Sequence, residues 1–116
     1  MACAAGLATL DIYKDEGLLT RGATMTQYWE DGLHSLKGLP NVIDIRAIGL
    51  VAGVELAPRP DAIGARGYDV MVDCFNSGLV LRQSGDTLAM SPPLIVEADE
   101  IDRMVAILGE AIQRVA

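Results

Sequence analysis

One arginine, Arg82, lies between two apolar runs in the stretch LVLRQSGDTLAMSPPLI, which begins at Leu79. Leu79–Arg82 and Thr87–Met90 predict two short strands, and the QSGD segment between them is typical of a hairpin turn. Arginine carries a rigid planar fork of N–H donors that matches a carboxylate with two parallel hydrogen bonds. A strand end beside a tight turn would hold that fork in place, which makes Arg82 a candidate anion-binding residue. The structural alternatives are an ion pair with Asp86 across the hairpin, or plain exposure to solvent.

Other side chains that could do chemistry are few. The two lysines, Lys14 and Lys37, lie near predicted helix ends among polar neighbours, and the single histidine, His34, lies on a polar helix end. With one histidine and the two thiols of Cys3 and Cys74, neither a His-rich metal site, a zinc cluster nor a hydrolytic triad can be assembled. We therefore expect no metal site, and no complete active site, in this chain.

The composition limits the classes of partner. The 116 residues suit one domain (1–116), and 51% hydrophobic with 22% charged residues is typical of a globular protein. A net charge of −7 argues against nucleic-acid binding, which needs clustered cations. Asp11, Asp44 and Glu55 interrupt the longest apolar runs, so no membrane span is expected, and no Lys or Arg precedes the apolar start as in a signal peptide. We expect a cytoplasmic protein.

Apolar periodicity predicts helices and strands that together form an α+β fold, a small and mostly antiparallel sheet covered by helices. The expected helices are Ala2–Asp15, Leu18–Leu36, one capped by Asp61 and ended by Asn76-Ser77-Gly78, and Ala98–Val115. The third helix has an expected core stripe of Ile63, Val70, Met71, Cys74 and Phe75. Two further strands are expected at Val42–Arg46, with Ile43 and Ile45 on one face, and at Leu50–Leu56.

The first of these helices is unusual. It is apolar nearly all round and lacks a capping residue at its start, so it should be buried on most sides. We expect a chain that begins inside a helix whose covering partner is missing.

Three motifs, in the same order, resemble the C-terminal part of class III pyridoxal-phosphate-dependent aminotransferases, and most closely the omega-amino-acid–pyruvate (β-alanine–pyruvate) group. The first, ACAAGLA at residues 2–8, resembles the helix after the family's HP pair. The second, DIRAIGLVAGVEL at 44–56, resembles the family's D-x-R-x-x-G-L-x-x-G-x-E-L hairpin. The third resembles the family's carboxylate-anchor region and consists of GLVLR at 78–82, Gly85-Asp86 and SPPLI at 91–95.

The resemblance implies the small C-terminal domain of a fold-type I enzyme, from a parent that is a homodimer and transfers amino groups between amino acids and keto acids. The family's Schiff-base lysine, its pyridine-binding aspartate and its phosphate-binding groups lie upstream of the matching region. We therefore assign no catalytic or cofactor-binding residue here, and expect pyridoxal phosphate only in the parent and no activity from the isolated chain. The resemblance assigns Arg82 as the substrate-binding residue, which holds a carboxylate and swings away from donors that lack one.

The remaining motif residues are interpreted as structural support. Gly85 and Asp86 would set the turn, Pro92-Pro93 would fix the exit of the chain, and Arg46 would pair with Glu55 across two strands. Two alternatives stay open. The chain could be a stand-alone, non-enzymatic interaction domain that binds through its first helix, or part of another class III enzyme, of the 4-aminobutyrate or acetylornithine type.

Overall fold

The computed structural model describes all 116 residues, Met1–Ala116, and has four helices and four strands. Their order is α1 (Ala2–Asp15), α2 (Leu18–His34), β1 (Val42–Ile48), β2 (Val51–Leu56), α3 (Ala65–Asn76), β3 (Arg82–Ser84), β4 (Thr87–Met90) and α4 (Ala98–Val115). No helix combines the length and the apolar character that a membrane span requires.

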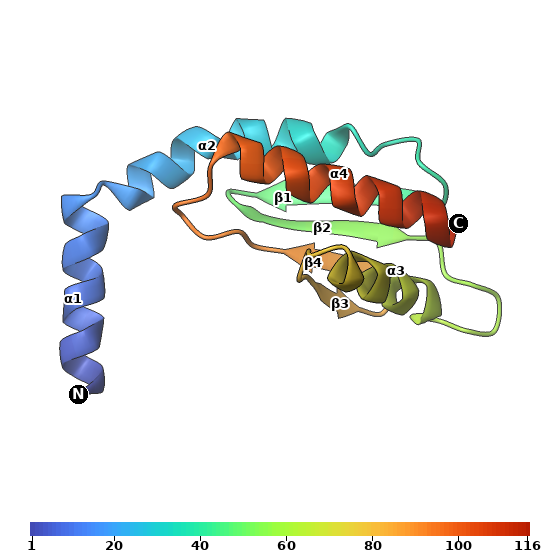
Figure 1. The fold of residues 1–116 in the computed structure, drawn as a ribbon, viewed down its shortest axis with the longest axis horizontal. Coiled ribbons are helices and arrows are strands. Elements are labelled where there is room, and N and C mark those ends of the chain that lie inside the picture. Colours follow the sequence, from blue (N-terminus) through green and yellow to red (C-terminus); the bar gives the residue numbers. More distant parts are fainter.

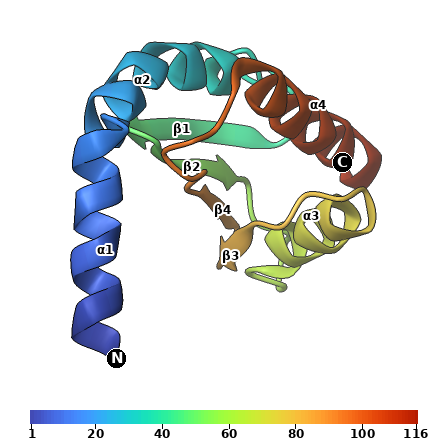
Figure 2. The same cartoon turned by 60° about the vertical axis from the view of Figure 1, so that its left-hand side comes forward.

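The strands form one sheet in the order β1-β2-β4-β3, and every neighbouring pair is antiparallel. Strand β2 therefore lies at the centre and pairs with its hairpin partner β1 and with β4, which follows α3 and β3 in sequence. Helices α2, α4 and α3 lie along one side of this sheet (Figures 1 and 2). The architecture is the α+β layer that the sequence predicts.

The core lies between the sheet and these three helices. Alternate residues of the central strands point into it, including Ala52, Val54 and Leu56 of β2 and Leu88 and Met90 of β4. Apolar residues of α2 and α4 supply the other wall, with Trp29, Leu33, Ile101, Leu108 and Ile112 all buried. No helix packs against the opposite face of the sheet (Figure 2), and Arg82 lies on that face.

Helix α1 stands apart from this body. It projects from the start of α2 (Figures 1 and 2), and it contains no buried residue. Its apolar side chains Leu7, Leu10 and Ile12 are exposed. The helix has the bounds that the sequence predicts, and its apolar residues face solvent in the structure.

Four local predictions were wrong, each because a backbone detail overrides the pattern. Asp61 does not cap α3, because it has a left-handed backbone (φ 60°) and the helix begins only at Ala65. For the same reason Ile63 precedes the helix and is exposed. Phe75 is inside α3, but it lies on the exposed side of the helix next to the buried Cys74. A bulge between Val42 and Asp44 breaks the alternation in β1, so that Ile43 is exposed while Ile45 is buried.

The fourth correction concerns the strand of Arg82. The sequence predicts a strand that ends at Arg82, before a four-residue turn, whereas β3 begins at Arg82 and only Gly85 and Asp86 form the turn. Gly85 adopts a left-handed conformation (φ 59°), which permits the tight reversal and pairs Ser84 with Thr87. Arg82 is therefore the first residue of a short edge strand.

Candidate carboxylate-binding groove at Arg82

Arg82 lines an open groove of about 670 Å³ on the surface. The groove, called here the Arg82 groove, forms where the segment leading into β3 diverges from the segment leaving β4. Its walls are mainly apolar, and its lining residues are Val51, Leu79, Val80, Leu81, Arg82, Ala89, Met90, Ser91, Pro92, Pro93 and Met104. A cationic fork at the edge of an apolar groove is suited to a small organic anion.

The strand register places Arg82 on the uncovered face of the sheet. Arg46, Gly53, Ala89 and Arg82 are successive partners across β1, β2, β4 and β3, so their side chains share one face. Gly53 and Ala89 leave the middle of this row low, with an arginine at either end. Three strand spacings separate the two arginine backbones by about 14 Å.

The two arginines differ in what they contact. Arg46 donates to Glu55 Oε2 at 2.6 Å and also to the carboxylate of Asp44, which raises the pKa of its guanidinium further. The predicted pair of Arg46 with Glu55 is thus confirmed. Arg82 makes no ion pair or side-chain hydrogen bond, and it is exposed. Arg46 has its charge matched within the chain, whereas the donors of Arg82 remain available to an anion.

Asp86 does not neutralise Arg82, although the sequence left that pairing open. Its carboxylate turns to the other side, where Oδ2 accepts the backbone N–H of Gly64 at 2.7 Å and Oδ1 accepts that of Gly67 at 2.9 Å. These two groups belong to the start of α3. The alternative prediction of an ion pair between Arg82 and Asp86 across the hairpin is therefore wrong.

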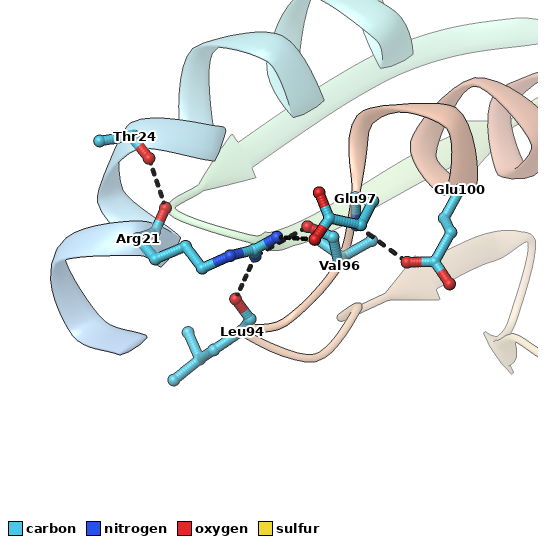
Figure 3. A network of polar contacts seen from close by, with 6 residues as sticks. All are labelled: Arg21, Thr24, Leu94, Val96, Glu97 and Glu100. Atoms are coloured by element: carbon cyan, nitrogen blue, oxygen red, sulfur yellow. Dashed lines mark hydrogen bonds and ion pairs between the residues drawn. The ribbon is translucent and has the colours of Figure 1, made fainter. Parts of the chain in front are cut away.

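The wall of the groove opposite Arg82 is the segment between β4 and α4, which contains Pro92 and Pro93. Arg21 of α2 fixes this segment by donating Nη1 to the carbonyl oxygens of Leu94 and Val96, both at 2.8 Å (Figure 3). Its Nη2 donates to Glu97 Oε1 at 2.6 Å (Figure 3). From the sequence, only Pro92 and Pro93 indicate that the chain leaving β4 has a fixed direction. Sequence reasoning missed Arg21, since nothing in a linear pattern links it to carbonyl groups more than 70 residues away.

The lysines of the chain do not reach this groove. Lys14 is exposed on α1 and Lys37 is exposed after α2, and neither lines the Arg82 groove. The residues present therefore do not form a site for pyridoxal phosphate by themselves, and no step through that cofactor can be assigned to them.

Comparison with known proteins agrees with the fold and the motifs. The family model described as aminotransferase class III matches residues 1–112. The chain is 52% identical to an omega-aminotransferase of Caulobacter vibrioides over 99% of its own length and 25% of that protein. It is 38% identical to a β-alanine–pyruvate aminotransferase of Pseudomonas aeruginosa over its full length and 26% of that protein.

Solved structures show the same correspondence. One described as a transaminase with L-Ala superposes with a TM-score of 0.93 and 32% identity, covering 98% of this chain and 28% of that one. The chain thus has the fold of a segment of the omega transaminases, which are fold-type I pyridoxal-phosphate enzymes, and spans about a quarter of the length of its curated relatives. It belongs to the class III aminotransferase family.

Proposed function

We propose that this chain is the substrate-recognition part of an omega-amino-acid–pyruvate aminotransferase, and that Arg82 binds the substrate carboxylate. One observation carries the proposal: Arg82 has no partner within the chain, while it lines an apolar groove of about 670 Å³. A guanidinium in such a position gains most from a ligand that supplies a planar carboxylate.

Exposure of Arg82 also suits a dual-substrate site. When the ligand has a carboxylate, two charge-assisted hydrogen bonds form in surroundings from which the ligand excludes water. When the ligand is a plain amine, an enclosed guanidinium without a partner would be unfavourable. The side chain of Arg82 belongs to an edge strand and can return to solvent, which avoids this penalty.

The complete activity requires residues outside these 116. Pyridoxal phosphate, which supplies the electron sink for amino transfer, would be held by the part of the enzyme that this chain does not include. The chain's own contribution is to bind and orient the substrate. We accordingly expect no amino transfer from β-alanine to pyruvate by the 116-residue chain alone.

The test is an Arg82→Ala variant of the full-length enzyme that contains this sequence. Its donor half-reaction is followed with β-alanine, which has a carboxylate, and with 2-aminobutane, which has none. We expect the apparent Kd for β-alanine to rise about 10- to 100-fold, the equivalent of losing a charged hydrogen-bonded pair, with little change for the amine.

Arg46→Ala is the matched control. It removes an arginine from the same face, but one that is already paired with two carboxylates of the chain. Equal losses for β-alanine and 2-aminobutane in the Arg82 variant, or the same selectivity change in the Arg46 variant, would refute the proposed role.

A further inference from the structure

We infer that Asp86 is a positioning residue for Arg82. Its buried carboxylate attaches the β3–β4 turn to the start of α3 and thereby sets where the guanidinium meets the substrate carboxylate. The inference rests on the proposed function of Arg82 and extends it to a residue that points away from the groove.

The carboxylate of Asp86 is suited to a fixed mechanical role. Asp86 is 8% exposed and is the buried charged residue of the chain, and both of its oxygens accept backbone N–H groups from α3, at 2.7 and 2.9 Å. Gly64 is the N-cap residue of that helix and Gly67 lies in its first turn, where N–H groups lack partners within the helix and the helix dipole favours an anion. A side chain from another element thus supplies the cap that Asp61 was expected to give.

Close packing reinforces these hydrogen bonds. A Cβ atom on Gly67 would lie 2.6 Å from the carbonyl oxygen of Gly85 and 2.9 Å from Cα of Asp86, and both of these neighbours are backbone atoms. Only glycine therefore allows the helix to approach the turn this closely. The α3–hairpin seam, meaning the contact of Gly64 and Gly67 with Gly85 and Asp86, has no room for a methyl group at Gly67.

The other end of the Arg82 segment is also attached to α3. The N–H of Leu79 donates to Cys74 O at 2.9 Å and that of Gly78 donates to Phe75 O at 3.1 Å, with Gly78 at φ 91°. This is the Schellman arrangement that ends a helix and fixes the direction of the outgoing chain. Helix α3 therefore holds residues 79–86 at both ends.

This double attachment matters because β3 is a weak strand by itself. It is three residues long, it lies at the edge of the sheet, and it pairs only with β4. Releasing the seam would leave the Arg82 segment held by its short ladder, by the Leu79 end and by one backbone bond, from the N–H of Leu56 to the carbonyl oxygen of Asp86 at 2.9 Å. A displacement of about 1 Å in a binding group can reduce kcat/KM by as much as 100-fold.

The experiment compares two variants of the full-length enzyme, Asp86→Asn and Gly67→Ala, in the donor half-reaction with β-alanine and with 2-aminobutane. The first places an amide NH2 group against a backbone N–H. The second keeps the carboxylate but forces the turn away from the helix. We expect both to raise the apparent Kd for β-alanine by roughly 10-fold or more, with the maximal rate and the amine Kd changed by less than about 2-fold.

Asp69→Asn is the matched control, because Asp69 lies on the same helix and pairs with Arg59 rather than with the hairpin. It should behave like the unmodified enzyme with both donors. A loss of equal size for both donors in the seam variants, or none, would overturn the inference, as would failure of both variants to fold, since the seam would then be a determinant of folding. If Arg82→Ala does not weaken β-alanine binding more than 2-aminobutane binding, the proposed function of Arg82 itself is refuted. If Arg82→Ala shows that difference and the seam variants do not, only the inference about Asp86 is refuted.

Discussion

Arg21 should contribute far more to stability than its surface ion pair alone would suggest. Its side chain is 28% exposed and joins α2 to the segment before α4 through three contacts. Two are hydrogen bonds from a charged donor to the carbonyls of Leu94 and Val96, each of a kind worth about 1.5–3 kcal/mol when fully protected. The third joins a Glu97 side chain that is 68% exposed and should add less than about 1 kcal/mol.

Replacement of Arg21 by alanine should therefore lower the free energy of unfolding by about 2–4 kcal/mol, allowing for partial replacement of the lost bonds by water. Glu97→Gln is the control, since it removes the ion pair and leaves both carbonyl contacts in place. It should lower the same quantity by less than about 1 kcal/mol. The difference between the two variants measures what the carbonyl contacts contribute.

The assay is urea unfolding followed by the fluorescence of Trp29, the only tryptophan of the chain, which is fully buried in the core. A midpoint shift with an unchanged slope reports stability alone. If Arg21→Ala and Glu97→Gln lower the free energy of unfolding equally, the carbonyl contacts do not stabilise the segment between β4 and α4. The explanation of how this wall of the groove is held would then be wrong.

Two further predictions concern the thiols. Burial, assisted by the neighbouring Asp73 carboxylate, raises the pKa of Cys74 from 9.0 to about 11, so between these values the unfolded chain releases the proton that the folded chain keeps. Stability should accordingly fall by up to about 3 kcal/mol as the pH rises from 9 to 11. In urea titrations across this range Cys74→Ala should lack that component, and an identical pH dependence in the variant would contradict the assignment. Under native conditions a disulfide reagent should modify exposed Cys3 rapidly and Cys74 only on unfolding, and equal rates would show that the core around Cys74 opens readily.

The extent to which sequence predicts this fold differs between helices and strands. The bounds of α1 and α4 match the prediction, because the apolar period of a helix and its ends are local properties. The start of β3 does not match, because the register depends on the geometry at Gly85 and on pairing with β4. The exposed Ile43 has the same kind of cause, since a bulge is decided by the partner strand.

The candidate site divides in the same way. Arg82 is predicted as a site residue from its type, its place beside a turn and the family motif, and in the structure it lines a groove. For Asp86 the sequence suggests a role in the turn, or an ion pair with Arg82, a cation close to it in sequence. Its actual partners, Gly64 and Gly67, lie 22 and 19 residues away and donate through their backbones. Side-chain patterns carry no signal for such contacts.

The binding of propionate to the full-length enzyme tests the central claim most directly. Propionate is β-alanine without its amino group, so its competitive inhibition of the β-alanine half-reaction reports carboxylate recognition without any amino transfer. If Arg82 is the carboxylate-binding residue, Arg82→Ala should raise the inhibition constant by about 10- to 100-fold, while Arg46→Ala leaves it unchanged. An inhibition constant that stays the same in the Arg82 variant would show that another residue binds the carboxylate.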